Sequence, residues 1–242
     1  MRVALIAVLL AAAAVAASAA PHASAAPRCA PGSVQTLTTA KRSVAAVVRR
    51  PATAVRAPGS SAVMRLATGD RYGFPTTLLV LARRVDAHCR ATWFRVRLPV
   101  YPNGTTGWVR ARDLKVSTLR RRIVVDLSSH RLFLYRSGRL ELTFPVAVGK
   151  ASTPTPRGRF YVTQRFVLPN ASGPYGPRAL GISAFSDVLR SWRDGGPIGL
   201  HGTNEPFSIS RPVSHGCVRL ANEVTFWLIL RIGPGVPVTI TS

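Results

Sequence analysis

The sequence SHGCVRL at residues 214–220, with HGTN at residues 201–204, decides how this chain is interpreted. Cys217 lies two residues from His215, so the two side chains stay close in any backbone conformation and share a face if the segment is a strand. Gly216, between them, has no Cβ and lets the backbone approach a bound molecule. A thiol near its ordinary pKa of about 8.5 is mostly protonated at neutral pH, so it needs a neighbouring imidazole to become a nucleophile. Cys217 is therefore the first candidate for chemistry.

Cys217 has three other interpretations: a buried structural residue, a disulfide partner or a zinc ligand. A lone cysteine is most often a small core hydrophobe, but the flanking Ser-His-Gly favours the reactive interpretation. Zinc sites ordinarily carry Cys-x-x-Cys or His-x-x-x-His pairs, which this segment lacks, so we expect no metal. His201 is too far along the chain for helix or strand periodicity to pair it with Cys217. Only a folded return of the intervening loop would bring the two together.

These two motifs resemble the catalytic (YkuD) domain of the L,D-transpeptidase family. That family carries a histidine followed by Gly-Thr and, after a variable loop, Ser/Thr-His-Gly-Cys with a following Arg or Asn. The resemblance continues upstream through four segments, IVVDL at 123–127, RLFLY at 131–135, FPVAVG at 144–149 and TPTPRGRF at 153–160. It covers the C-terminal half of the chain, and no obvious segment of the domain is missing.

The resemblance implies a two-step acyl transfer on peptidoglycan that needs no cofactor. Cys217 would attack the carbonyl between the third and fourth residues of a stem peptide, release the terminal D-amino acid, and pass the acyl group to an amine of another stem. His201 is then the proton acceptor, and backbone amides around Gly216 and Cys217 stabilise the oxyanion. His215 is expected to orient the loop by hydrogen bonding.

The remaining motif residues are expected to shape or line the site. Ser214 is expected to shape the turn rather than react. Arg219 is expected to hold a substrate carboxylate, the alternative being an ion pair within the protein. Tyr175, in a loop rich in Gly and Pro, is expected to line the substrate cleft, the alternative being a place in the core. Gly202 and Thr203 are the other candidates for substrate binding.

Residues 1–25 have the features of a secretory signal peptide: a basic start, a short apolar segment and a small-residue end. A membrane anchor is the alternative, but the apolar run is short, rich in Ala and interrupted by Pro21. We therefore expect an exported protein that acts in the cell wall or a periplasm-like space. After cleavage of the leader it would have no stable membrane span.

The rest of the chain is expected to form a linker and two domains of mainly β structure. Residues 26–42, rich in Pro, Ser, Thr and Ala, are expected to be the linker. Residues 43–116 alternate short apolar runs with turn signals and resemble a bacterial SH3-like domain, a small β-barrel. Residues 117–242 are expected to form the β-rich catalytic domain, with one helix after the cysteine, capped by Asn222 and ended at Gly233.

The net charge of +24 comes from 33 Lys and Arg against 9 Asp and Glu. Such a field favours polyanions. No helix-turn-helix, zinc-finger or RRM pattern accompanies it, so we expect stem peptides and anionic wall polymers as partners rather than nucleic acid. The three cysteines fit an exported protein in which Cys29 and Cys89 pair and Cys217 stays free, although spacing alone does not determine the pairing.

Two other classes of function use the same sequence features. One is a cysteine L,D-carboxypeptidase, in which water replaces the amine acceptor. The other is a non-catalytic wall-binding protein in which the SH3-like module does the binding. The acceptor pocket is not readable from the sequence, so transfer and hydrolysis both remain open.

Overall fold

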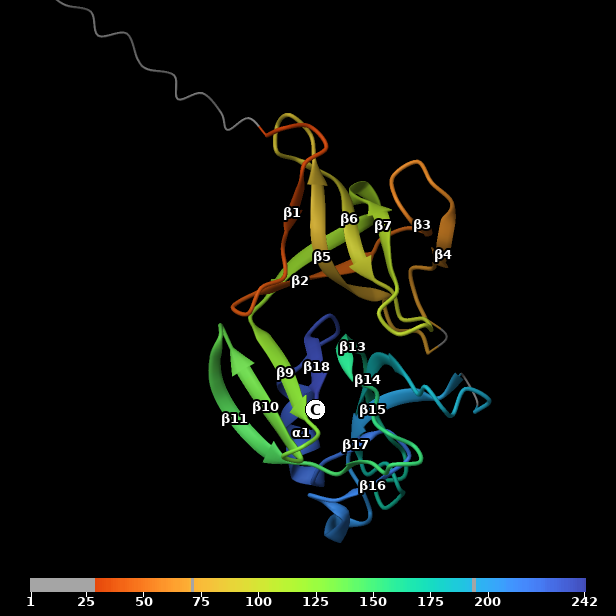
Figure 1. The fold of residues 1–242 in the computed structure, drawn as a ribbon, viewed down its shortest axis with the longest axis vertical. Helices are drawn as coiled ribbons and strands as arrows, with labels where there is room; N and C mark the ends of the chain where they lie inside the picture. Colours follow the sequence, from red (N-terminus) through yellow and green to blue (C-terminus); the bar gives the residue numbers. More distant parts are fainter. Residues whose placement is uncertain (1–28, 71, 193–194) are drawn as a thin grey trace, which may run out of the picture.

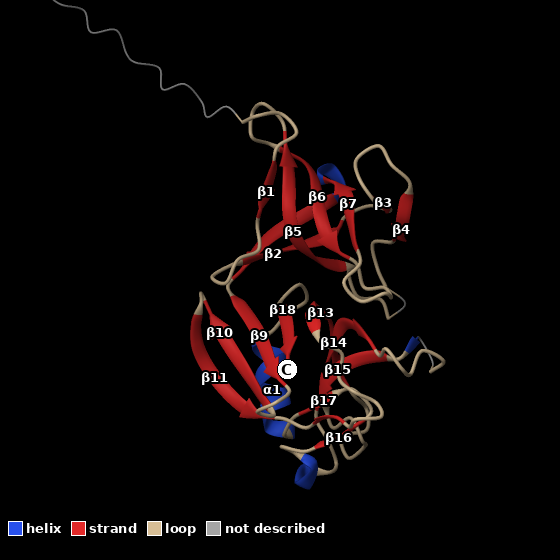
Figure 2. Ribbon diagram, viewed as in Figure 1, coloured by secondary structure: helices blue, strands red, loops and turns tan. Residues whose placement is uncertain are grey.

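The computed structural model describes residues 29–70, 72–192 and 195–242. Within these residues the chain forms two eight-stranded sheets and a short two-stranded ribbon, with little helix (Figures 1 and 2). The mainly β fold is thus as expected. The signal peptide expected at 1–25 lies outside the described residues. Within the described part of the chain, no helix is long and apolar enough to cross a membrane.

The first sheet, which lies in the N-terminal region (residues 29–70 and 72–119), has the strand order β4-β3-β7-β6-β5-β2-β8, with β1 paired to β5. Its strands are β1 (Val34–Thr36), β2 (Ser43–Val48), β3 (Ala52–Val55), β4 (Ala62–Leu66), β5 (Thr77–Val85), β6 (Ala91–Arg97), β7 (Thr106–Arg110) and β8 (Leu114–Leu119). A 3-10 turn, η1 (Ala111–Asp113), joins β7 to β8. Alternating residues such as Phe94 and Val96 point into an apolar core, as the period of a strand requires.

The N-terminal region differs from its sequence prediction in two places. Residues 26–42 were expected to be a linker, but from Cys29 onward they join the sheet: β1 pairs with β5, and Cys29 forms a disulfide with Cys89. The Pro and Ser content concealed a three-residue strand whose partner lies far along the chain. The expected domain boundary at 116/117 falls inside β8, whose residues all pair with β2. The disulfide confirms the suggested pairing, and the SH3-like assignment stays a prediction.

The second sheet, which lies in the C-terminal region (residues 120–192 and 195–242), has the strand order β11-β10-β9-β18-β13-β14-β15-β17. Its strands are β9 (Arg121–Asp126), β10 (Arg131–Arg136), β11 (Arg139–Pro145), β13 (Gly158–Val167), β14 (Arg178–Phe185), β15 (Pro197–His201), β17 (Val218–Arg219) and β18 (Pro237–Thr241). β12 (Val148–Gly149) and β16 (Pro212–Ser214) form the ribbon, and η3 (Pro206–Ser208) precedes β16. The β18–β9 and β15–β17 pairs are parallel, which places residues far apart in sequence side by side.

The helix expected after the cysteine is α1 (Asn222–Arg231), and it packs against β14 through buried residues including Leu228. The predicted cap is wrong: Ala221 is the N-cap residue and no side chain caps the helix. Asn222 is instead the first helical residue, and its Oδ1 accepts a hydrogen bond of 2.8 Å from the backbone N–H of Thr203. The Asn222 side chain therefore makes a tertiary hydrogen bond with Thr203 instead of the helix cap that the local sequence predicted.

The two sheets pack directly against each other. Tyr161 of β13 is fully buried in the apolar cluster of the N-terminal region. The Asn103 side chain bonds both backbone groups of Phe185, donating to its carbonyl at 2.7 Å and accepting from its N–H at 2.9 Å. Gly235 has a φ of +87°, and a Cβ there would lie 2.3 Å from the Cβ of Ala45. The two regions therefore approach so closely here that a side chain at position 235 would clash with Ala45.

Candidate active site

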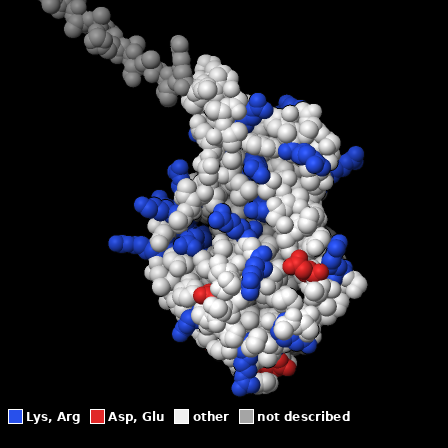
Figure 3. Space-filling model, viewed as in Figure 1, with Lys and Arg blue, Asp and Glu red and all other residues white. Residues whose placement is uncertain are grey.

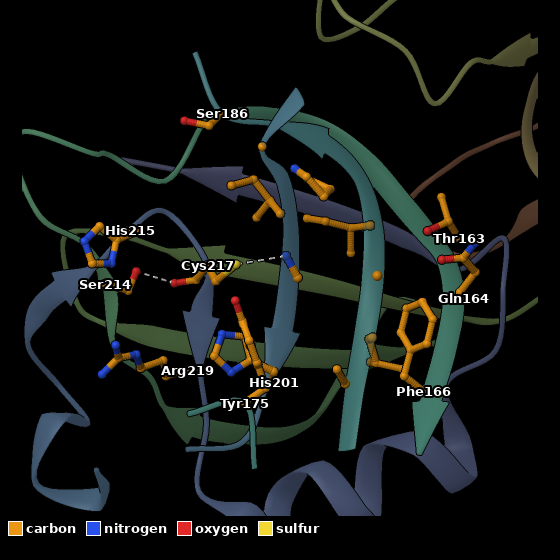
Figure 4. Close-up of a pocket in the computed structure, with 18 of the residues that line it drawn as sticks. Thr163, Gln164, Phe166, Tyr175, Ser186, His201, Ser214, His215, Cys217 and Arg219 are labelled. Atoms are coloured by element: carbon orange, nitrogen blue, oxygen red, sulfur yellow. Dashed lines mark hydrogen bonds between the residues drawn. The ribbon is translucent and has the colours of Figure 1, made fainter. Parts of the chain in front are cut away.

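A cleft of about 980 Å³ lies on the second sheet and crosses β13, β14, β15 and β17. Figure 4 shows that the predicted side chains gather at one end of it. The lining there includes Cys217, His201, Tyr175, Ser214, His215 and Arg219. The sequence motifs, separated along the chain, thus meet in one cavity.

Cys217 precedes β17 and carries the free thiol of the described residues. The Gly199 N–H on neighbouring β15 points to its Sγ at 3.4 Å. Burial raises the pKa of the Cys217 thiol, and the Gly199 hydrogen bond and the Arg219 charge only partly oppose this effect. The resting side chain is therefore a neutral thiol.

His201 ends β15 and is 4% exposed. The folded return that the sequence required is the parallel pairing of β15 with β17, which sets His201 opposite Arg219. The imidazole lies beside Cys217 in Figure 4. Its Nδ1 is 2.6 Å from the carbonyl oxygen of Gly202, and because a carbonyl only accepts, Nδ1 carries the proton. Burial lowers the pKa of His201 to about 4, so near neutral pH the ring is uncharged and Nε2 carries the free lone pair.

Ser214 shapes the loop before the thiol, in agreement with the prediction. Its hydroxyl donates to the Cys217 carbonyl at 2.6 Å and accepts from the Gly216 N–H at 3.1 Å. Gly216 has a φ of +110°, a backbone conformation that favours glycine. Because the Gly216 amide is already bonded to Ser214, it is not available to an oxyanion in this arrangement. The Cys217 amide has no hydrogen bond among those of the described residues.

His215 and Arg219 differ from the roles expected of them. His215 is exposed and makes no hydrogen bond in the described part of the chain; its ring lies 5.6 Å from that of Trp192. Ser214, rather than His215, orients the loop because its short side chain points inward. Arg219 donates to the Glu205 carboxylate and lies 3.4 Å from the hydroxyl of Ser208. The alternative for Arg219, an ion pair within the protein, is the one observed.

Tyr175 and the residues after His201 complete this end of the cleft. The Tyr175 side chain is 54% exposed, and its ring centroid is 4.9 Å from that of His201 in an edge-on arrangement. Gly202 and Thr203, expected to touch substrate, are buried and do not line the cleft. They instead pack behind His201, where a Cβ on Gly202 would lie 2.2 Å from the Asn222 Oδ1. These two residues therefore fix the start of the loop that follows His201.

The comparison with known families decides the identity of this C-terminal region. Residues 120–240 match the family model of the L,D-transpeptidase catalytic domain, YkuD. The chain belongs to the L,D-transpeptidase family. The YkuD protein of Bacillus licheniformis is 40% identical over 124 residues, which are 51% of this chain and 67% of that protein.

Solved L,D-transpeptidases are more distant. The Enterococcus faecium enzyme, as its C442S mutant, is 25% identical with a TM-score of 0.37, and the match covers 50% of this chain and 49% of that one. An L,D-transpeptidase from Mycobacterium smegmatis is 15% identical with a TM-score of 0.42, over 69% of this chain and 90% of that chain. This chain thus spans about half the length of the E. faecium L,D-transpeptidase.

Three residues of this L,D-transpeptidase site were missed by sequence reasoning. Thr153 donates to the Ser214 carbonyl at 3.1 Å, and it lies in the TPTPRGRF segment that already carried the resemblance. The Trp192 ring contacts that of His215, and Tyr72 of the N-terminal region lines the far end of the cleft. No spacing rule connects Trp192 or Tyr72 to the cysteine. Among the described residues, no group of three or more His, Cys, Asp or Glu is placed to hold a metal ion.

Proposed function

We propose that this protein is an exported L,D-transpeptidase that cross-links or remodels peptidoglycan by acyl transfer through Cys217. The observation that carries the proposal is the β15–β17 pairing, which brings a buried, neutral His201 to the free thiol in an open cleft. Family membership supports the reaction class.

The reaction starts from an uncharged pair rather than a thiolate and an imidazolium. The pKa of the thiol is raised and that of the imidazole is lowered, so the proton stays on Sγ until substrate is bound. As Sγ bonds to the stem carbonyl, Nε2 of His201 takes the thiol proton. The Nδ1–H bond to the Gly202 carbonyl holds the required tautomer and stabilises the imidazolium that forms.

The same proton then passes to the leaving group, which completes the acylation of Cys217. His201 donates it to the nitrogen of the departing D-amino acid, which leaves Cys217 acylated as a thioester. The amine of a second stem then attacks the thioester carbonyl, and His201 accepts a proton from that amine. The carbon–sulfur bond breaks as the new amide bond forms, and His201 returns the proton to Sγ, which restores the thiol. We assign the oxyanion to the Cys217 amide, because the Gly216 amide is bonded to Ser214.

The other predicted side chains receive supporting roles. The exposed face of Tyr175 is proposed to contact the stem next to His201. Arg219 would reach a substrate carboxylate only by sharing or exchanging its contact with Glu205, whose side chain is half exposed. We therefore assign Arg219 first to holding the η3 loop and second to substrate.

Export and wall binding are proposed from the substrate and the charge. Peptidoglycan is extracytoplasmic, which agrees with the secretory features of residues 1–25. Lysines and arginines are scattered over both halves of the face shown in Figure 3, with few acidic residues among them. Such a surface favours anionic wall polymers.

Product analysis on a defined tetrapeptide stem tests the proposal. Mass spectrometry should find a cross-linked dimer and a released D-amino acid with the native protein and neither product with Cys217→Ala. A shortened peptide without dimer would make the protein a carboxypeptidase. Neither product, together with no covalent adduct from a carbapenem, would leave only the non-catalytic wall-binding alternative.

A further inference from the structure

Among the described residues of the N-terminal region, Tyr72 lines the cleft. Tyr72 comes from the segment between β4 and β5, whereas the remaining lining residues come from the C-terminal region. Its neighbours in the lining, Thr163, Gln164 and Phe166, lie on the side of the cleft away from Cys217 in Figure 4. The cleft therefore has a reactive end and a distal end, and the distal end is shared between the two regions.

The distal wall is firmly attached to β13. We call residues 70 and 72–74 the Asp70 turn. The carboxylate of Asp70 accepts the N–H groups of Tyr72 at 2.8 Å and Phe74 at 3.0 Å, and its second oxygen accepts from the Gln164 amide. The Phe166 ring meets both aromatic rings of the turn edge-on, at 5.4 Å for Tyr72 and 5.8 Å for Phe74. The position of Tyr72 is thus set by contacts across the two regions.

The strand order gives the length of the cleft. From Cys217, beside β17, to Phe166 on β13, a bound chain crosses β15 and β14. Three strand spacings amount to about 14 Å, because neighbouring strands lie about 4.8 Å apart. An extended peptide advances about 3.4 Å per residue, so about four units bridge the thiol and the distal wall.

The direction of the bound donor follows from the chemistry. The acyl residue is joined to Sγ through its carbonyl, so the rest of the donor extends from its amino side. The proposed cut after the third stem residue leaves three stem residues on Cys217: the acyl residue itself and two residues on its amino side. The fourth unit from the thiol is then the sugar to which the stem is attached.

We propose that the Asp70 turn is a substrate-positioning element, in which Tyr72 and Phe166 contact the sugar bonded to the amino-terminal end of the donor stem. The inference rests on the proposed function. The aromatic faces suit the C–H face of a sugar ring, and a small molecule on the thiol does not reach them. The N-terminal region would thereby distinguish stems still attached to glycan from free stem peptides.

Two donors test this proposal: a free tetrapeptide and the same tetrapeptide attached to its disaccharide. Tyr72→Ala should raise KM for the disaccharide form by about 10-fold, the scale for losing one aromatic contact, and leave kcat and the free tetrapeptide unchanged. Tyr72→Phe should behave like the native protein. Tyr135→Ala is the matched control, since Tyr135 lies on β10 against Arg122 and outside the cleft lining. The rate of carbapenem addition to Cys217 should be equal in all four proteins.

Other outcomes overturn the proposal. Equal KM changes for both donors, or no change for either, would contradict the proposed contact with the sugar. A change confined to KM of the acceptor would assign the Asp70 turn to the second stem. Because the Tyr72 side chain is 51% exposed, its truncation should leave the fold intact; thermal unfolding checks this, and Tyr72→Leu is the second variant, with the same expected KM change. A native protein that forms no adduct and releases no D-amino acid would contradict the proposed function instead.

Discussion

The two eight-stranded sheets differ in the polar side chains that they bury. Among the described residues, the buried polar side chains of the N-terminal region are Ser43 and Asp113. The C-terminal region buries the others, which are Thr153, Thr155, Ser183, Ser186, His201, Thr203, Ser208, Ser214 and Thr225. Of these, Ser186, His201 and Ser214 line the cleft. Burying a polar group costs free energy unless it is hydrogen-bonded, so this concentration indicates a region built for chemistry as well as for stability.

The cysteines show the same contrast. Cys29 and Cys89 are joined in the N-terminal region, where the bond links the segment before β1 to the turn between β5 and β6. Cys217 of the C-terminal region is free and lies beside an imidazole. A thiol-reactive reagent should therefore modify Cys217 in the C-terminal region and leave the disulfide-bonded cysteines of the N-terminal region unmodified.

The largest expected effect is the loss of all acylation when Cys217 is replaced. A carbapenem, whose strained lactam opens on nucleophilic attack, should add once to the native protein and not at all to Cys217→Ala. Peptide mapping by mass spectrometry locates the adduct. An adduct on Cys29 or Cys89 would contradict the conclusion that only the C-terminal region carries a reactive thiol.

The next effect compares the buried and the exposed histidine. His201→Ala should slow acylation by about 100-fold to 10,000-fold, the usual cost of losing a general base. His215→Ala should have a far smaller effect, because its ring contacts Trp192 and not the thiol loop. Stopped-flow measurement of carbapenem addition gives both rates. The reverse ranking would exchange the two roles.

The pH dependence of acylation tests the neutral resting pair. Since the pKa of His201 is lowered to about 4, the base keeps its lone pair as pH falls through 6 and loses it only below about pH 4. The rate should therefore stay level from pH 7 to about 5 and then fall about tenfold per unit below pH 4, where the protonated form dominates. Circular dichroism at each pH controls for unfolding. A fall centred near 6.5, the ordinary value, would show that the ring is not shielded from solvent.

A smaller effect concerns the stability of the N-terminal region by itself. The fragment 29–119 contains every strand of the first sheet and should unfold cooperatively. The predicted domain 43–116 lacks β1, the end of β8 and the disulfide, whose 60-residue separation is worth about 4 kcal/mol by loop entropy. Urea denaturation of both fragments, with reduced 29–119 as control, measures the difference. Equal stabilities would restore the sequence-based boundary.

The smallest effect is the salt dependence of wall binding. The charge is spread over both regions rather than concentrated at the cleft, so retention on anionic wall material should weaken gradually as salt rises. Exposed charges are screened beyond about 8 Å at physiological ionic strength. Sedimentation with purified walls, using the 29–119 fragment in parallel, shows whether both regions contribute. Retention that does not change with salt would contradict an electrostatic origin.

The sequence predicted which residues meet in the site but not all of their partners. The resemblance of the two motifs to the L,D-transpeptidase family implied that His201 and Cys217 meet, whereas their spacing alone left the folded return open. Whether His215 and Cys217 share one face of the segment was not predictable, since Gly216 between them adopts a positive φ that no regular strand has. The partners Asn222 and Thr203 lie 19 residues apart, beyond any helical or strand period.

Amino-acid composition was a poor guide to the structure of residues 26–42. Residues 26–42 have the composition of a linker, yet a short β-strand and a disulfide attach them to the sheet. Tyr72 belongs to a different region from the catalytic motif, so neither periodicity nor motif spacing could connect it to the cleft. Contacts between distant segments were thus the main part of the structure that local sequence did not contain.

Strand β18 has a consequence for the order of assembly. It lies between β9 and β13, and the β9–β11 hairpins and the β13–β17 strands join the same sheet through it. Contacts of such long sequence separation form slowly, because a large loop must close first. During synthesis the sheet therefore remains divided until residues 237–241 are available. A chain stopped before them carries both catalytic motifs without the continuous sheet that supports the cleft.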